Sequence, residues 1–426
     1  MQERIEATYL IETPLDPVAI AAIMAGEQSS GTFVKVAGET DELRARAAAT
    51  VLSVEEIEPA AAPSLASAFL ERKRVAGPWR RARVVIAYPT ANIAANLPTL
   101  AATLAGNLYD LGEVTGLRLE ACRMPQSYRA RFDFPRVAIG GARAALGVED
   151  RPVFGTIIKP NVGMRPHEIA GLVAMLCEAG VDFIKDDEVC ADPDHAPIAA
   201  RVPAVMSVIR AHRDRTGRNV MMAFNITDET DAMRRHADLV AREGGDCVMI
   251  SVNWCGLSAI QSLRRATPLA IHAHRNGYGA FSRHPLLGIG FDAYSALWRL
   301  SGVDHMHVHA IGGKFCNSAE EVTASARRCL APLAHDAPDA SDAVMPAFSS
   351  GQWAGTLPMT LEAVPSGDLL FMCGGGILAH PMGASAGVAS LRQAWAAWRT
   401  GESLPAAAAN APELRAALDF FGRAAH

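Results

Sequence analysis

The sequence lacks the signals of a nucleic-acid-binding, secreted or membrane-spanning protein. No block of five or six basic residues is present, and 40 Lys and Arg against 45 Asp and Glu give a formal net charge of −5, which disfavours binding to a phosphate backbone. The N-terminus carries Glu3 and Glu6 where a signal peptide needs positive charge and then an apolar run. The longest stretch without a charged side chain, residues 369–391, contains five Gly, a Pro and a His, which predicts strand, loop and helix. We therefore expect a cytoplasmic protein with no nucleic-acid or membrane partner.

Closely spaced cysteine pairs are also missing. The eight Cys include no Cys-x-x-Cys pair and lie mostly inside apolar segments, which predicts buried thiols. A small disulfide-stapled domain is excluded, because 426 residues allow about two to four domains with a sizeable core. With 50% hydrophobic and 20% charged residues, neither a disordered chain nor a coiled coil fits the composition.

What the sequence does contain, from Arg151 onward, is one recurring pattern. A short apolar run rich in β-branched residues is followed by polar or Gly residues and then by an amphipathic helical stretch. The expected strands are Val153–Lys159, Asp182–Glu188, Val220–Ile226, Cys247–Val252, Leu269–His274, Asp304–His309, Ala343–Ser349 and Leu369–Cys373. Expected helices include Pro166–Glu178, Glu229–Glu243 and Ser318–Leu330. Eight such units in about 240 residues predict a closed (β/α)₈ TIM barrel, an α/β fold.

The first 150 residues follow a different pattern and predict a separate α+β domain of the ferredoxin-like kind. The expected strands are Glu6–Ile11, Gly31–Val36, Val84–Tyr88 and Leu117–Cys122, and the expected helices are Pro17–Ala25 and Leu97–Tyr109. We place the boundary near Leu146–Pro152, which gives an N-terminal domain at 1–148 and a barrel domain at 149–426 that ends in a helix from Ala411.

Polar residues gather at the carboxyl ends of the expected barrel strands, where barrels of this type carry their catalytic groups. Lys185, Asp187 and Glu188 combine an amine with two carboxylates, a setting for an oxygen-liganded Mg²⁺. Two carboxylates hold Mg²⁺ loosely, and a carbamate formed from Lys185 and CO₂ would supply a third anionic oxygen. The alternative is a solvated acidic strand end that Lys185 neutralises.

Three further groups follow later strands. His274, Arg275 and His307 offer donors for a phosphate or carboxylate, although structural histidines are common. Gly374-Gly375-Gly376 can bind a phosphate through backbone N–H groups. Gly312-Gly313-Lys314 predicts a mobile loop that carries a cation, with an ordinary surface turn as the alternative.

Taken together and in this order, the elements resemble the large subunit of ribulose-bisphosphate carboxylase (RuBisCO), from Glu27-Gln28-Ser29-Ser30-Gly31-Thr32 to the triple Gly. The resemblance implies that Lys185 is a carbamylated lysine and that Asp187 and Glu188 are Mg²⁺ ligands. It implies a proton-handling role for Lys159, a place beside the metal for His274, and stabilisation of a carboxylate by the mobile-loop Lys314. The implied phosphate sites are Thr32, Gly351, Gly374 and Gly375 for one group, and Arg275, His307 and Ser349 for the other.

The same resemblance implies an assembly and its cofactors. Glu27 and Asn107 match residues that complete the site of a neighbouring subunit, so the resemblance implies a homodimer with shared active sites and no small subunit. The implied cofactors are Mg²⁺ and CO₂, the latter as the carbamate of Lys185.

Four positions depart from the carboxylase pattern. Asn161 replaces a second lysine, Tyr278 a histidine, Phe33 a tryptophan, and His309 a small residue at the second phosphate site. We therefore expect a RuBisCO-like protein that is not a true carboxylase.

The expected chemistry starts with proton abstraction beside a carbonyl, with Lys159 or the carbamate of Lys185 as the base. We favour an enzyme that handles a carboxyl group, a 3-oxo-isoapionate 4-phosphate transcarboxylase/hydrolase. The alternatives are a 5-methylthioribulose 1-phosphate isomerase or a diketo-phosphate enolase of methionine salvage, and a non-catalytic relative that binds a sugar phosphate.

Overall fold

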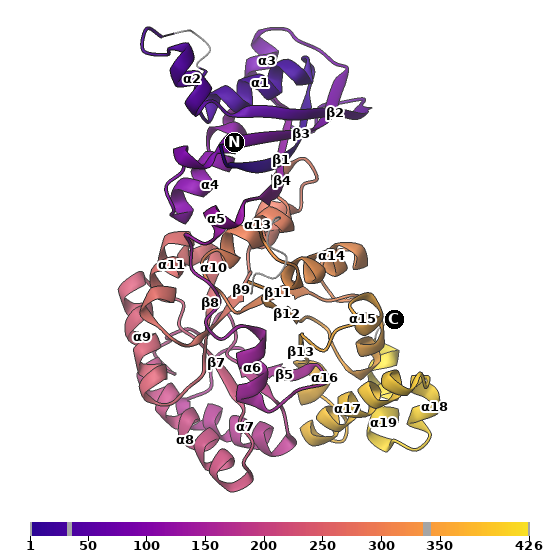
Figure 1. Cartoon of the computed structure of the whole chain (residues 1–426). Helices are drawn as coiled ribbons and strands as arrows, with labels where there is room; N and C mark the ends of the chain where they lie inside the picture. The colour runs from indigo at the N-terminus through magenta and orange to yellow at the C-terminus, as the bar shows by residue number, and fades with distance from the viewer. Residues whose placement is uncertain (1, 32–35, 335–341, 425–426) are drawn as a thin grey trace. The chain divides into compact units, whose positions relative to one another are not determined.

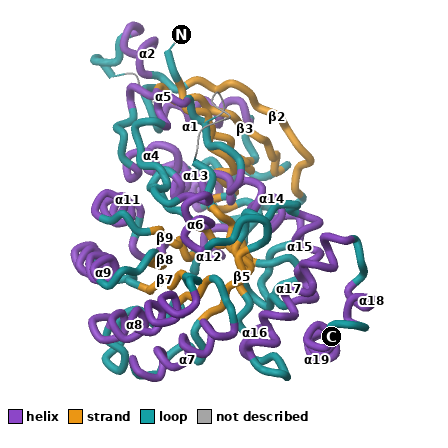
Figure 2. The backbone as a smooth tube through the Cα atoms, turned by 60° about the horizontal axis from the view of Figure 1, so that its bottom comes forward, coloured by secondary structure: helices purple, strands orange, loops and turns teal. Residues whose placement is uncertain are grey.

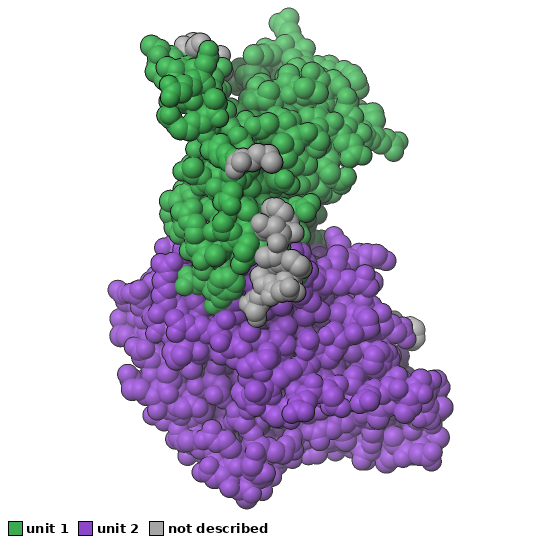
Figure 3. All heavy atoms as spheres, in the orientation of Figure 1, with its two compact units in different colours: residues 1–134, 277–301, 332–340 green, residues 135–276, 302–331, 341–426 purple. Residues whose placement is uncertain are grey.

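The computed structural model describes residues 2–31, 36–334 and 342–424 and divides into two compact units (Figure 3). Unit 1 comprises Met1–Phe134, Gly277–Ser301 and Pro332–Ala340, and unit 2 comprises Pro135–Asn276, Gly302–Ala331 and Ser341–His426. Unit 1 thus includes two segments that the sequence assigns to the barrel domain.

Unit 1 is built on one five-stranded sheet with the order β10-β4-β1-β3-β2. Its strands are β1 (Arg4–Thr13), β2 (Thr50–Ala60), β3 (Trp79–Pro89), β4 (Gly116–Arg123) and β10 (Leu287–Ile289). Its helices are α1 (Pro17–Glu27), α2 (Asp41–Ala47), α3 (Ala68–Arg72), α4 (Leu97–Ala105), α5 (Gln126–Arg129), α12 (Tyr278–Ser282), α13 (Phe291–Arg299) and the 3₁₀ turns η1 (Thr90–Asn92) and η2 (Asn107–Asp110). Strands β1 to β4 pair antiparallel, and β1 alternates buried and half-buried residues because one face of the sheet covers the core.

One strand of this unit was not predicted, and two of the expected elements differ from the structure or lie outside the described residues. Strand β2 was missed because its Val-Glu-Glu-Ile-Glu run is largely exposed and does not alternate. The expected helix Leu97–Tyr109 ends at Ala105, where Gly106 leaves the helical conformation and η2 begins. The expected strand Gly31–Val36 falls mainly on residues outside the described part of the chain.

Unit 2 is a closed barrel of eight parallel strands, which confirms the predicted fold class (Figure 1). The strands are β5 (Val153–Ile157), β6 (Phe183–Lys185), β7 (Met221–Asn225), β8 (Cys247–Ser251), β9 (Ala270–His274), β11 (His305–His309), β12 (Met345–Phe348) and β13 (Leu370–Met372). Each lies inside one of the eight predicted ranges. Every strand is buried, because the strands enclose the core on one side and carry helices on the other.

Helices surround these strands in the order of the chain. They are α6 (Ala138–Leu146), α7 (Pro166–Ala179), α8 (Ile198–Thr216), α9 (Thr230–Arg242), α10 (Val252–Cys255), α11 (Leu257–Ala266), α14 (Ala319–Leu330), α15 (Leu357–Ala363), α16 (Gly375–Leu378), α17 (Ala384–Thr400), α18 (Leu404–Ala408), α19 (Pro412–Ala424) and the 3₁₀ turn η3 (Ala354–Thr356). Figure 2 shows α7, α8, α9 and α11 outside β5, β7, β8 and β9. Local sequence determines where α14 begins, because Ser318 and Glu321 form a capping box at its N-terminus.

Most of the cysteines are buried thiols, as predicted from the sequence. All eight Cys are free, and six of them are buried. Among the described residues, no helix combines the length and the apolar character needed to cross a bilayer.

One buried carboxylate ties the start of α6 to the barrel. Asp304, which is fully buried, accepts hydrogen bonds from the backbone N–H groups of Val137 and Ala138, both at 2.8 Å. Its other oxygen accepts from the Ile271 N–H at 2.8 Å and from Arg264 Nη1 at 3.0 Å. Asp304 therefore satisfies four donors where the solvent cannot reach them.

We predict that Asp304→Asn destabilises the protein by about 3 to 5 kcal/mol, because it removes a buried negative charge that lies 3.0 Å from the buried Arg264. The free energy of unfolding in urea measures this change. The exposed pair Arg399–Asp150 provides the control, since Asp150→Asn should cost less than about 1 kcal/mol. Equal losses in the two variants would contradict the prediction.

Candidate active site

The carboxyl ends of β5 and β6 bring two lysines and two carboxylates together. Lys185, the last residue of β6, is 2% exposed, and its Nζ lies 3.5 Å from Glu188 Oε2. Lys159, just beyond β5, places its Nζ 2.6 Å from Asp187 Oδ2 and also donates to Asn161 Oδ1 at 2.7 Å. The strand-end residues that the sequence singled out thus form one connected cluster.

Burial sets the protonation of this cluster. Because Lys185 is surrounded by protein, desolvation lowers the pKa of its amine, and the neighbouring carboxylates of Glu188 and Asp187 only partly oppose that shift. A lysine with a lowered pKa has a larger fraction of neutral, nucleophilic amine at neutral pH. Such an amine is the form that reacts with CO₂.

Sequence reasoning missed the residues that hold this cluster in place. Asn225, the fully buried last residue of β7, donates from Nδ2 to the carbonyl oxygens of Asp187 and Glu188 at 3.0 and 3.2 Å. Its backbone N–H donates to Asp186 Oδ2 at 2.9 Å, and Asp186 also pairs with the buried Arg201 at 3.3 Å. The available signal was an amide side chain at the carboxyl end of an otherwise apolar strand.

Histidines from β9 and β11 form the next part of the site. His274 Nε2 lies 3.5 Å from Glu188 Oε2, and the rings of His274 and His307 are 4.4 Å apart. His307 links inward to His272 at 2.8 Å and outward to Ser349 Oγ at 2.9 Å. Burial lowers the pKa of all three imidazoles well below the ordinary value, so they are neutral at physiological pH.

The loops after β11 and β12 lie against one another. A Cβ on Gly313 would lie 2.8 Å from the Ser350 carbonyl oxygen, and one on Gly351 would lie 3.9 Å from the Lys314 nitrogen. Gly351 has φ +75°, a conformation that favours glycine. Lys314 itself is exposed, with its Nζ 5.4 Å from the centre of the Phe315 ring. The predicted loop is therefore packed against the β12 loop at Gly313, while the side chain of Lys314 is exposed to solvent.

The glycines after β13 divide into two kinds. Gly376 is required by packing, because a Cβ there would lie 2.3 Å from the Gln352 carbonyl oxygen. Gly375 has open space within 4 Å of the Cβ position, and Gly374 faces only Ile157 Cδ1 at 3.6 Å. Gly374 and Gly375 thus leave room for a ligand to approach the backbone, as a phosphate site requires.

Several of the sequence-predicted or departing positions belong to unit 1. Asn107 Nδ2 donates to Glu27 Oε1 at 3.0 Å, and both side chains are exposed. The structure therefore brings this predicted pair together. Tyr278 is buried among aromatic rings, with its centroid 4.3 Å from that of Tyr294. Thr32 and Phe33 lie outside the described residues.

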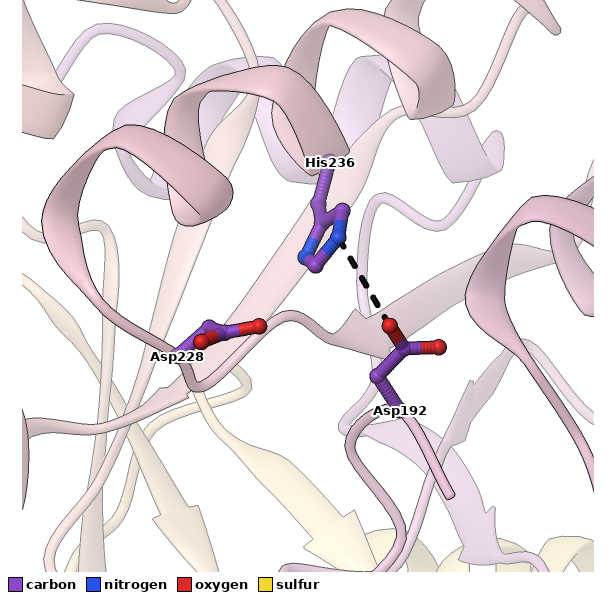
Figure 4. Close-up of side chains that lie close together, drawn as sticks. All are labelled: Asp192, Asp228 and His236. Atoms are coloured by element: carbon purple, nitrogen blue, oxygen red, sulfur yellow. Dashed lines mark ion pairs between the residues drawn. The ribbon is translucent and has the colours of Figure 1, made fainter. Parts of the chain in front are cut away.

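A second group of ligand-type side chains lies on the loops after β6 and β7 and on α9. Figure 4 shows Asp192, Asp228 and His236, whose nearest ligand atoms all lie within 4.8 Å of one another. The two carboxylates are exposed and already accept backbone N–H groups close to the starts of α8 and α9, Asp192 from Ile198 at 2.6 Å and Asp228 from Glu229 at 2.7 Å. Those local hydrogen bonds account for the positions of both carboxylates.

An eight-stranded barrel with an amine, carboxylates, imidazoles and glycines at its strand ends defines an α/β-barrel protein with an enzyme-like site. Residues 138–421 match the catalytic domain of the ribulose bisphosphate carboxylase large chain, and residues 5–128 match its N-terminal domain. The chain belongs to the RuBisCO large-chain family.

Particular relatives are similar over the full length. A 3-oxo-isoapionate-4-phosphate transcarboxylase/hydrolase of Xanthobacter autotrophicus is 45% identical, with 99% of this chain and 100% of the relative covered. A 3-oxo-isoapionate-4-phosphate decarboxylase of Rhizobium etli is 40% identical, with 98% of each chain covered. The crystal structure of a rubisco-like protein from Burkholderia fungorum has a TM-score of 0.93 and 64% identity, and covers 98% of this chain and 100% of that one.

We predict that Mg²⁺ binds at Asp187 and Glu188, and that Asn225→Ala weakens this binding by about 10- to 100-fold, because the backbone of Asp187 and Glu188 loses its buried donor. Calorimetric titration with Mg²⁺ in bicarbonate buffer measures the affinity.

Asn219→Ala is the matched control: Asn219 precedes the amino end of β7 and donates to Ala145 and Asp246. Its loss should leave Mg²⁺ affinity unchanged. If Asn225→Ala binds Mg²⁺ as tightly as Asn219→Ala and the unaltered protein do, the prediction is wrong.

Proposed function

We propose that the protein acts on 3-oxo-isoapionate 4-phosphate as a transcarboxylase/hydrolase. The observation that carries the proposal is the cluster at the ends of β5 and β6, where Lys159 contacts Asp187 beside the buried Lys185 amine. The full-length similarity to proteins with activities on that compound supports this choice of substrate. A binding module without catalysis would have no use for a buried lysine next to two carboxylates.

The donor set fits Mg²⁺. Asp187 and Glu188 are hard oxygen ligands, and Lys185 has the buried, partly neutral amine that a carbamate requires. We propose that Lys185 as its CO₂ carbamate, Asp187 and Glu188 hold the ion. When bound, Mg²⁺ supplies positive charge that stabilises an oxyanion developing on the substrate.

Side chains and backbone groups of the protein carry out the remaining steps. Lys159, held at 2.6 Å from Asp187, is placed to move a proton at the carbon beside the substrate carbonyl. In a 3-oxo acid the bond to the carboxyl carbon can break with its electron pair entering an enolate, while the carboxyl group leaves as CO₂. After the enolate is protonated and a proton is removed from the carbon on the other side of the carbonyl, the new enolate carbon bonds to that CO₂. Lys314 is the exposed cation that stabilises the carboxyl group in these steps. The open backbone at Gly374 and Gly375 binds the phosphate.

We also propose a homodimer in which Glu27 and Asn107 complete the site of the partner subunit. Their mutual hydrogen bond leaves both side chains exposed, as residues that meet a second chain would be. A two-fold interface presents the same pair on both chains and so builds two equivalent sites.

A substrate comparison tests the proposed function. The purified protein is incubated with 3-oxo-isoapionate 4-phosphate, 5-methylthioribulose 1-phosphate or ribulose 1,5-bisphosphate in Mg²⁺/bicarbonate buffer, and the products are identified by mass and NMR. We expect turnover of the first compound alone. Turnover of the methylthio-sugar alone would identify a methionine-salvage isomerase, and labelled CO₂ fixed into phosphoglycerate would identify a true carboxylase.

A second prediction separates the roles of the two catalytic lysines. Lys159→Ala should abolish solvent-deuterium exchange at the carbon beside the carbonyl, because the proton then has no acceptor. Lys314→Ala should retain the exchange and lose product, because the carboxyl group then lacks its cation. NMR of the recovered substrate measures exchange, and loss of exchange in both variants would remove Lys314 from the later step.

A further inference from the structure

His309, at the end of β11, has a backbone conformation that most residues avoid. Its φ is +69°, and the pairing of β11 with β12 shifts register between His307 and His309. Histidine tolerates the left-handed region better than most side chains, yet glycine adopts it without strain. Keeping an imidazole at this position therefore has a cost, and strain of this kind concentrates at functional sites.

Hydrogen bonds fix the orientation and the tautomer of the ring. His309 Nδ1 lies 2.6 Å from Asn317 Oδ1, and Asn317 Nδ2 donates to Glu321 Oε2 at 3.2 Å. Because the Glu321 carboxylate can only accept, the amide must present its oxygen to His309, so Nδ1 carries the proton. Nε2 then has a lone pair, and it has no hydrogen-bond partner among the described residues.

Packing and charge complete the description of this ring. Phe315 packs against His309 with 4.6 Å between the ring centroids and an angle of 38° between the ring planes. Burial, and after it the positive charge of Arg275, lowers the pKa of His309 to about 4, so the ring is a neutral acceptor at physiological pH.

The neighbours of His309 form a mixed recognition site. The Ser349 N–H donates to the His309 carbonyl oxygen at 3.0 Å. The buried Arg275 directly follows β9, the strand that pairs with β11, so it lies at the same end of the barrel as His309. One cation next to one fixed acceptor suits an anionic group with a hydroxyl beside it. A phosphate dianion presents only acceptor oxygens, and one of them would meet the Nε2 lone pair.

We propose that His309 is a specificity-determining residue that accepts a hydrogen bond from a substrate hydroxyl adjacent to a carboxylate, and that it thereby excludes a second phosphate group. The proposal rests on the proposed function, in which the site binds a phosphorylated keto acid. Beyond that function, the proposal states that the carboxylate end of the substrate binds beside Arg275 and that the Nε2 atom of His309 selects it.

Binding of two five-carbon probes tests this proposal without any turnover. Ribonate 5-phosphate has a carboxylate with an adjacent hydroxyl, and ribulose 1,5-bisphosphate has a second phosphate at that end. We expect the protein to bind ribonate 5-phosphate at least about tenfold more tightly by calorimetry. His309→Gly should reduce that preference by about tenfold or more, with weaker binding of the first probe and tighter binding of the second. Glycine accommodates φ +69°, so the variant keeps its backbone.

Two further variants sharpen the test. Arg74→Gly replaces a different non-glycine residue at positive φ, which is exposed and belongs to unit 1, and should leave the preference unchanged. Asn317→Ala removes the hydrogen bond that holds the proton on Nδ1 of His309, so both tautomers become accessible. Its preference for ribonate 5-phosphate should lie between those of the unaltered protein and His309→Gly.

An unchanged preference in His309→Gly, or tighter binding of the bisphosphate by the unaltered protein, would overturn the proposal. So would the absence of binding by both probes, because Arg275 would then hold no anion. Inactivity toward 3-oxo-isoapionate 4-phosphate with the expected probe preferences would instead contradict only the proposed reaction.

Discussion

Closure of eight parallel strands into a barrel is the constraint on which the rest of unit 2 depends. Because all strands run in the same direction, their carboxyl ends meet at one rim, and residues from distant parts of the chain become neighbours there. Lys159, Lys185 and His274 belong to three different strands or their loops, yet each contacts one of the adjacent carboxylates Asp187 and Glu188. The barrel thus assembles a site that no local segment contains.

Burial at that rim gives the site its electrostatic character. Lys185 and the imidazoles of His272, His274 and His307 are desolvated together, and each has a pKa shifted toward its neutral form. Neutral amines and imidazoles can accept protons or react with CO₂, which charged ones cannot. Exposed Lys314, by contrast, lies in solvent on a loop with a packed base. The fold therefore separates buried, neutral amine and imidazole groups from an exposed positive charge.

Hydrogen bonds of buried polar groups hold both ends of the barrel in place. At the carboxyl ends of the strands, Asn225 binds the backbone of Asp187 and Glu188, and Arg201 binds Asp186. At the other end, Asp304, which directly precedes β11, anchors the start of α6. Each of these polar groups is almost completely buried, so its removal leaves partners that solvent cannot satisfy. Positioning in this protein is consequently a matter of buried polar contacts as much as of apolar packing.

Periodicity and residue type in the sequence determined the eight barrel strands, the antiparallel strands β1, β3 and β4, and the strand ends that carry Lys185, Asp187 and Glu188. Apolar runs of strand length followed by helical periods have few other solutions. Strand β2 and the addition of β10 to the N-terminal sheet were decided only by tertiary contacts. The role of Asn225 was hidden for the same reason. A single hydrogen bond between residues distant in sequence leaves no periodic trace, and only the folded chain shows which polar side chain meets which partner.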